Sequence, residues 1–189
     1  MELGKTFYAK DRREWRAWLS KNHRREKEVW LVYFRKASGK PRIPYNDAVE
    51  EALCFGWIDS TVKKVDADCY AQRFTPRRPG SGLSPANRER IRKLIAAGSM
   101  TPAGLAAVSH AFKPNGRDKK FAVAKGILAE IKKNARAWRN FKRLPDGYKR
   151  IRIGYIEGRR RHCKEAFEKS LRHFVKMTEK GKRFGFIRE

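Results

Sequence analysis

The stretch CFGWIDS, residues 54–60, predicts the junction between a helix and a strand. Before it, residues 46–55 repeat apolar side chains at helical spacing, and Asp47 and Glu50 stand at the spacing of a capping box. Gly56 is expected to end the helix, because glycine adopts the left-handed conformation of a helix C-terminus without steric cost. After it, WIDSTVKKV alternates between two faces, so Asp59 is predicted to lie on a strand.

Residues 1–112 contain the other elements of a predicted α+β domain. DRREWRAWLSKNH predicts a first helix, with Asp11 as its N-cap and Glu14 three residues later. The apolar run VWLVYF is typical of a buried strand, and CYAQRFTP is predicted to return as the hairpin partner of the strand after Gly56. Three strands with packed helices indicate the α+β class. Two further helices are predicted to begin at Ser84–Pro85 and Thr101–Pro102.

Residues 113–189 predict a separate all-α unit. FKPNGRDKK contains Pro, Asn and Gly in succession and is the best candidate for the linker, with the domain boundary between residues 112 and 113. A long apolar stripe at helical spacing runs from Ala124 to Trp138, and LPDGY breaks it. A last helix is predicted over residues 157–178. Its inward side chains are expected to be Cys163, Phe167, Leu171 and Phe174.

The charge of the chain points to anionic partners. Among 189 residues, 47 Lys and Arg stand against 20 Asp and Glu, which gives a formal net charge of +27. Residues 1–112 hold 22 basic and 12 acidic side chains, whereas residues 113–189 hold 25 and 8. Such an excess attracts nucleic acid, an anionic membrane surface or another polyanion. The alternative is that the positive charge only solvates the surface.

Other global features predict a cytoplasmic protein. No stretch approaches the roughly 20 apolar residues of a membrane-spanning helix, so no transmembrane segment is expected. The three cysteines are widely spaced and lack the density of a secreted disulfide framework. A reducing compartment is therefore the expected location.

Four motifs carry a family resemblance. EEALCFGWIDS, DADCYAQRFTPRRPGS and NRERIRKLIAAGSMTPAG resemble the YdeI/OmpD-associated family, sometimes labelled bacteriocin-protection proteins. AWRNFKRLPDGYKRIRIGYIEGRRR is similar to the OmdA-type helical C-terminal domain of that family, so the likeness spans nearly the whole chain. It implies a YjbR/CyaY-like core with a small antiparallel sheet packed by helices, and a role in stress response or bacteriocin protection. The chain departs from the family at Leu83, where a Trp is usual, and at EGRRRHCKEA, which makes the tail more cationic.

One constellation predicts a site for an anionic ligand with a phosphate or carboxylate group. Unpaired N–H groups at a helix start favour an anion, and two guanidinium groups on a glycine-containing loop can close over it. The alternative is that the arginines are solvated and that Ser84 only caps the helix. The loop lacks the Gly-Lys pair of a nucleotide-hydrolysing P-loop. The candidate ligand-binding residues are Arg77, Arg78, Ser81 and Ser84, with Asp59, Gln72 and Arg73 on the neighbouring strands.

Catalysis, metal binding and a cofactor are not expected. Asp59 and Ser60 lack a nearby nucleophile or base, and an ion pair between Asp59 and Arg73 is the favoured interpretation. Cys54 lies on an apolar helix face, where a free cysteine usually acts as a small hydrophobic residue. The pair His162 and Cys163 lacks the spacing of metal ligands. A non-enzymatic binding protein is therefore the first functional prediction.

Nucleic-acid binding by the C-terminal helices is the second functional prediction. Single-strand binders place exposed aromatic rings among basic groups, and Tyr45, Tyr148 and Tyr155 are the candidates for stacking. The basic residues expected to contact nucleic acid are Lys132, Lys133, Arg136, Arg139, Arg159, Arg160, Lys164, Arg172 and Lys176.

Overall fold

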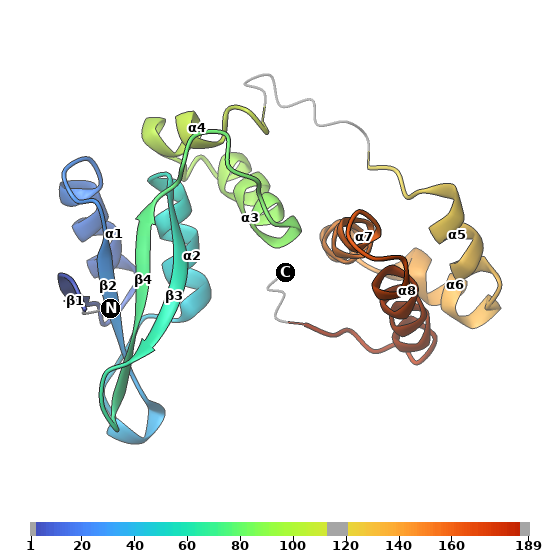
Figure 1. Cartoon of the computed structure of the whole chain (residues 1–189), viewed down its shortest axis with the longest axis horizontal. Helices are drawn as coiled ribbons and strands as arrows, with labels where there is room; N and C mark the ends of the chain where they lie inside the picture. The colour runs from blue at the N-terminus through green and yellow to red at the C-terminus, as the bar shows by residue number, and fades with distance from the viewer. Residues whose placement is uncertain (1–2, 113–120, 186–189) are drawn as a thin grey trace. The chain divides into compact units, whose positions relative to one another are not determined.

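The computed structural model describes residues 3–112 and 121–185, which belong to two compact units (Figure 1). The first unit comprises Met1–Gly82 and Arg90–Gly116, and the second comprises Leu83–Glu89 and Arg117–Glu189, so the division falls inside helix α3 (Pro85–Ala96). Most of the predicted linker lies outside the described residues, because residues 113–120 are not among them. The boundary between residues 112 and 113 therefore stays a prediction.

The first unit contains a four-stranded sheet of strand order β1-β2-β4-β3. Its strands are β1 (Thr6–Tyr8), β2 (Val29–Phe34), β3 (Trp57–Lys64) and β4 (Cys69–Pro76). The α+β class is confirmed, but the expectation of an antiparallel sheet is wrong at one edge. There β1 pairs with β2 in parallel, whereas β2, β4 and β3 form antiparallel pairs. A strand of three residues is too short to show alternation in the sequence.

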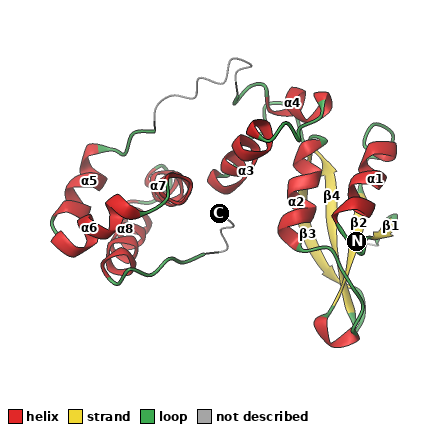
Figure 2. Ribbon diagram, turned by 180° about the vertical axis from the view of Figure 1, so that it is seen from behind, coloured by secondary structure: helices red, strands yellow, loops and turns green. Residues whose placement is uncertain are grey.

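Helices α1 (Arg12–Asn22) and α2 (Tyr45–Cys54) cover one face of this sheet (Figure 2). The Asp11 side chain accepts a hydrogen bond from the Glu14 amide at 2.9 Å, which confirms the predicted N-cap of α1. Trp15 connects the layers, because its ring packs 5.3 Å from Phe74 of the sheet and its Nε1 donates to the Ala48 carbonyl of α2 at 3.0 Å. Apolar burial between these layers is the main stabilising contribution to the unit. Its largest fully buried side chains are Trp15, Trp30, Trp57, Tyr33 and Phe74.

The ends of α2 test the predicted helix–strand junction. Gly56 has a φ of 76°, so the predicted left-handed stop between α2 and β3 is confirmed. The predicted capping box at its start is wrong, because Pro44 is the N-cap and Asp47 lies within the first turn. Asp47 there lies 3.7 Å from Arg12 of α1, so its carboxylate contacts a neighbouring helix.

The remaining helices of this part begin at predicted caps. Thr101 Oγ1 accepts from the Gly104 amide at 3.2 Å at the start of α4 (Pro102–Val108), and Ser84 Oγ accepts from the Asn87 amide at 3.2 Å at the start of α3. A short 3-10 helix, η1 (Lys36–Ser38), follows β2.

The second unit is helical, with α5 (Lys125–Lys132), α6 (Ala135–Arg143), α7 (Asp146–Arg160) and α8 (Lys164–Glu179). The stripe from Ala124 to Trp138 is divided between two helices, because Asn134 accepts from the Ala137 amide at 2.9 Å and caps α6. The predicted last helix over residues 157–178 is likewise wrong in extent, since it is broken between α7 and α8. The buried core of the unit consists of Ile127, Ile131, Phe141, Tyr148, Ile153, Ile156, Leu171 and Phe174.

Cys163 occupies the break between α7 and α8. It is exposed, and its Sγ accepts from the Ala166 amide at 3.5 Å as the N-cap of α8. The prediction that Cys163 faces the core is therefore wrong. Among residues 3–112 and 121–185, no helix has the length and apolar character needed to cross a membrane.

Candidate functional site

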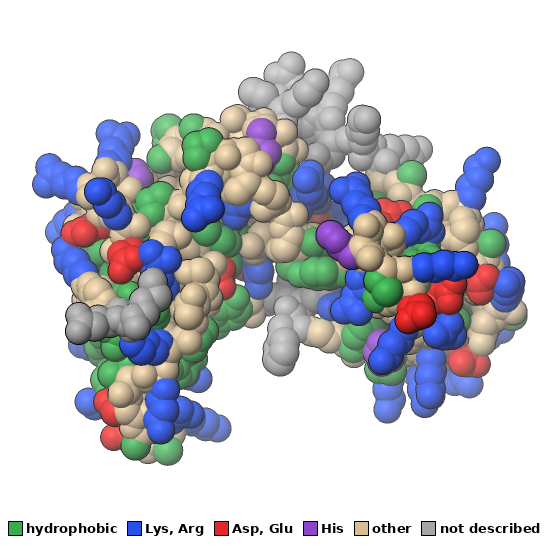
Figure 3. Space-filling view, viewed as in Figure 1, with side chains coloured by type: hydrophobic (Ala, Val, Ile, Leu, Met, Phe, Trp, Pro, Cys, Tyr) green, Lys and Arg blue, Asp and Glu red, His purple; other side chains and the backbone are tan. Residues whose placement is uncertain are grey.

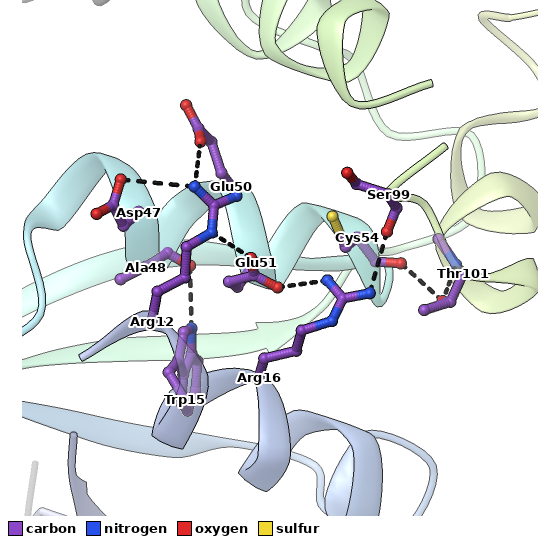
Figure 4. Close-up of polar contacts among 11 residues, drawn as sticks. Arg12, Trp15, Arg16, Asp47, Ala48, Glu50, Glu51, Cys54, Ser99 and Thr101 are labelled. Atoms are coloured by element: carbon purple, nitrogen blue, oxygen red, sulfur yellow. Dashed lines mark hydrogen bonds and ion pairs between the residues drawn. The ribbon is translucent and has the colours of Figure 1, made fainter. Parts of the chain in front are cut away.

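Arg12 and Arg16 of α1 both bind a glutamate of α2 (Figure 4). Glu51 of α2 is 3% exposed, and its carboxylate accepts from Arg12 Nε and, at 2.6 Å, from Arg16 Nη1. Burial lowers the pKa of Arg12, but the hydrogen bond and charge of Glu51 outweigh it and raise the pKa overall. Glu51 therefore holds α1 against α2 through two charge-assisted contacts.

Asp59 belongs to a polar cluster on the sheet, not to an ion pair with Arg73. Tyr45 Oη donates to Asp59 Oδ2 at 2.8 Å, and Gln72 Nε2 donates to the same oxygen at 2.9 Å. Arg73 donates instead to Glu28, at 2.8 Å from its Nε. Asp59 pairs in register with Phe74, so the side chain of the adjacent Arg73 projects from the opposite face. The predicted Asp59–Arg73 ion pair is therefore wrong.

A buried tyrosine lies beside this cluster. Tyr33 is 1% exposed, its hydroxyl has no hydrogen-bond partner among the described residues, and its ring stacks on Tyr70 at 5.2 Å. Burial raises the pKa of Tyr33, and the nearby Tyr70 and Asp59 raise it further. On β3, the Ser60 hydroxyl donates to the Arg73 carbonyl at 3.3 Å.

Cys54 on α2 has the environment of a core residue. It is fully buried, and burial raises the pKa of its thiol to about 11, with a further contribution from Glu51. A thiol with a raised pKa is a poor nucleophile at neutral pH, because only the thiolate reacts readily.

Arg77 closes its own loop. Its Nη2 donates to the Ser81 carbonyl at 3.3 Å, to Ser81 Oγ at 3.1 Å and to the Gly82 carbonyl at 2.9 Å. Its Nε is buried and has no hydrogen-bond partner among the described residues, and burial lowers the pKa of the guanidinium. Arg78 next to it is exposed.

The predicted ligand-binding residues thus fall into separate places. Arg77 and Ser81 are brought together, Asp59 and Gln72 belong to the cluster on the sheet, and Arg73 is paired with Glu28. Ser84 caps α3 and belongs to the second unit.

The nine C-terminal basic residues named from the sequence are all exposed. Two of them have a carboxylate partner, since Lys133 lies 2.6 Å from Glu130 and Arg172 lies 3.7 Å from Glu168. Figure 3 shows acidic side chains among the basic ones on the visible face of the second unit. Three of the nine line a cavity of about 590 Å³ that also contains three glutamates. These groups are Arg160, Arg172 and Lys176, with Glu130, Glu168 and Glu179.

The candidate stacking rings differ in exposure. Tyr45 is 44% exposed and Tyr155 is 41% exposed, whereas Tyr148 is buried in the core of the second unit. Tyr148 is therefore excluded as a stacking platform, because nucleic-acid bases stack on exposed rings.

A second cavity, of about 250 Å³, lies in the second unit and was missed by sequence reasoning. Arg159 is the one residue of the nine that lines it, and the sequence did not single out its other basic side chains. A signal was present, because Arg152 and Arg159 are two helical turns apart on α7, and Lys169 and His173 are one turn apart on α8. The cavity is lined by Arg152, Tyr155, Ile156, Arg159, Lys169, Ser170, His173 and Phe184.

Comparison with known protein families shows which family the chain belongs to. The model of a family described as "Domain of unknown function (DUF8412)" matches residues 7–107, from β1 into α4. The chain belongs to this family. The DUF8412 match covers more than half of the chain and leaves α5–α8 outside it. No curated protein and no solved structure matches the chain. The resemblance to the YdeI/OmpD-associated family stays a prediction.

Proposed function

We propose that this DUF8412 protein is a non-enzymatic binding protein that holds an anionic ligand at the Arg77 loop, residues 77–82. The observation that supports it is the charge of Arg77. Arg12, Arg16, Arg73 and Arg150 each contact a glutamate, whereas Arg77 contacts no carboxylate in the described part of the chain. Partial burial of an uncompensated cation is costly, and a bound anion would supply the missing charge.

The surroundings of Arg77 favour a small ligand. Arg78 adds an exposed guanidinium. Apart from the adjacent residues, no described heavy atom lies within 4 Å of the positions where Gly80 and Gly82 would carry a Cβ. A phosphate or carboxylate group can therefore approach the loop backbone closely, where N–H groups provide hydrogen-bond donors. The resemblance to the YdeI/OmpD-associated family supports a role of this binding in stress or bacteriocin protection.

The proposal is tested by titrating the full chain with sodium phosphate at constant ionic strength and following backbone amides by two-dimensional NMR. We expect saturable shifts of the Ser81 and Gly82 amides, and affinity weakened about tenfold in Arg78→Ala, because a hydrogen bond to a charged group is worth roughly 1.5–3 kcal/mol. Arg78 is used because Arg77 also holds the loop together. Shifts that rise linearly without saturation would refute the site.

Nucleic-acid binding through the C-terminal helices is the second candidate. It is favoured because seven of the nine exposed basic residues have no carboxylate partner within the described ranges, the exceptions being Lys133 and Arg172. The test compares binding of single-stranded RNA over a salt series by two triple variants of equal charge. Lys132→Ala/Arg136→Ala/Arg139→Ala is expected to reduce the salt slope by about 0.7 for each lost contact. The control is Arg13→Ala/Lys21→Ala/Arg24→Ala in the first unit, and equal losses in both variants would indicate only generic attraction.

A further inference from the structure

The cavity of about 250 Å³ in the second unit is lined by several cationic side chains and, among the described residues, by no acidic one. Arg152, Arg159 and Lys169 contribute positive charge to its wall, His173 contributes an imidazole and Ser170 a hydroxyl. None of the described residues that line it is an Asp or a Glu, whereas the cavity of about 590 Å³ contains three glutamates beside three basic residues. A cavity lined by charge of one sign concentrates a counter-ion of the opposite sign.

The side chains that line the cavity recur at helical spacing on α7 and α8, so each helix presents them on one face. Arg152, Tyr155 and Arg159 stand three, four and seven residues apart on α7, and Lys169 and His173 stand four apart on α8. Helices α7 and α8 pack against each other through buried residues that include Ile156 and Phe174. The cationic groups are therefore carried on packed helices, which hold a binding geometry more accurately than a loop does.

Arg152 contacts aromatic rings, and no carboxylate of the described chain pairs with it. Its guanidinium carbon lies 4.5 Å from the ring centre of Phe184, 5.6 Å from that of Tyr148 and 6.0 Å from that of Tyr155. Burial lowers its pKa, and its Nε is buried without a hydrogen-bond partner among residues 3–112 and 121–185. Stacking therefore orients the guanidinium. Its Nε is enclosed, so the Nη groups, which donate to no described residue, are the donors left for a ligand.

The chain after α8 completes this arrangement. The Phe184 amide donates to Tyr148 Oη at 3.1 Å, and the Phe184 ring also meets His173 edge-on at 4.7 Å. Gly185 has a φ of 85°, and a Cβ at this position would collide with the Arg152 guanidinium. The chain thus passes directly against Arg152 and keeps Phe184 over it.

We propose that this cavity binds the phosphate group of a small phosphorylated molecule. Arg152 and Arg159 would contact phosphate oxygens through their planar donor pairs, Lys169 would add a point charge, and Ser170 and His173 would donate to the remaining oxygens. Convergence of several cations without a carboxylate favours a doubly charged phosphate ester over a singly charged carboxylate. The site lies in the second unit and outside the DUF8412 match, so it is independent of the Arg77 loop.

The experiment follows the Ser170 and Phe184 amides of the full chain by NMR during titration with inorganic phosphate, ribose 5-phosphate, AMP and adenosine at constant ionic strength. We expect saturable shifts with the phosphorylated ligands and none with adenosine. AMP binding more tightly than inorganic phosphate would support a nucleotide as the source of the phosphate, and equal binding would support phosphate recognition alone. Saturation by adenosine, or by none of the four, overturns the proposal.

A matched pair of variants separates the site from general attraction. Arg159→Gln removes a group that lines the cavity, and Arg160→Gln removes the same charge one residue later, where the side chain lines the cavity of about 590 Å³. We expect Arg159→Gln to weaken phosphate binding about tenfold and Arg160→Gln to leave it unchanged. Equal weakening in both variants would overturn the proposal. Shifts of Ser81 and Gly82 in the same spectra report separately on the Arg77 loop.

Discussion

Around Glu51 two arginines share one buried carboxylate, whereas the cationic groups around Arg152 share none among the residues that the structure describes. In the first region, Glu51 accepts from Arg12 and Arg16 and connects α1 with α2. In the second region, Arg152 is surrounded by aromatic rings and makes no hydrogen bond to another described residue. Both regions desolvate guanidinium groups in part, so both incur an electrostatic cost. Within residues 3–112 and 121–185, a carboxylate compensates this cost in the first region and not in the second.

The same contrast exists within one helix. Arg150 of α7 donates to both oxygens of Glu89, at 2.8 Å from Nε and 2.6 Å from Nη2. Arg152 follows two residues later and has no carboxylate partner in the described ranges. A bidentate pair with a buried glutamate stabilises the fold. An oriented and uncompensated arginine, by comparison, is suited to an external anion. The pairing of each arginine therefore indicates whether its charge serves the fold or a ligand.

Removing the shared carboxylate should have the largest effect. Glu51→Gln keeps the shape of the side chain. It leaves Arg16 without a carboxylate partner among the described residues, and it leaves Arg12 with only the more exposed Asp47 and Glu50. We expect a loss of about 2–3 kcal/mol in the free energy of unfolding, below the roughly 3–5 kcal/mol of fully buried pairs, because the two arginine side chains are 40% and 41% exposed. Urea unfolding followed by circular dichroism measures it.

Glu50→Gln is the matched control for this prediction. Glu50 also contacts Arg12, at 3.1 Å, but its side chain is 20% exposed against 4% for Glu51. We expect a loss below about 1 kcal/mol. Equal losses in the two variants would mean that the buried position of Glu51 is unimportant and would weaken the contrast between the two regions.

Sequence patterns predicted the parts of the fold that depend on neighbouring residues. Asp11, Ser84 and Thr101 each cap a helix through an amide three residues away, and Gly56 stops a helix by its own conformation. Such features need no knowledge of tertiary structure. The parallel pairing of β1 was missed because it joins residues more than 20 positions apart, such as Thr6 and Trp30.

The candidate sites were less accessible to sequence reasoning for the same reason. The partner of Arg73 is Glu28, 45 residues earlier, and the register of the sheet decides that Asp59 faces Gln72 instead. The cavity at Arg152 requires α7, α8 and the chain around Phe184 to come together. Net charge predicts that the chain attracts anions, but only packing shows which cations a carboxylate already neutralises.

The smallest expected change in the free energy of unfolding is that of Arg152→Met, and it tests whether Arg152 serves the fold or a ligand. Arg150→Met leaves Glu89, which is 5% exposed, without its bidentate partner and should lower the free energy of unfolding by about 2 kcal/mol. Arg152→Met removes an uncompensated cation but keeps an unbranched chain against Phe184, so we expect a change below about 1 kcal/mol. Urea unfolding of both variants, with and without phosphate at constant ionic strength, measures the comparison. Phosphate should stabilise Arg150→Met as it does the unmodified chain. In Arg152→Met the stabilisation by phosphate should fall to what binding at the Arg77 loop contributes. If Arg152→Met instead costs as much as Arg150→Met and keeps its response to phosphate, the aromatic contacts of Arg152 serve the fold, and the distinction between paired and unpaired arginines fails at the residue that defines it.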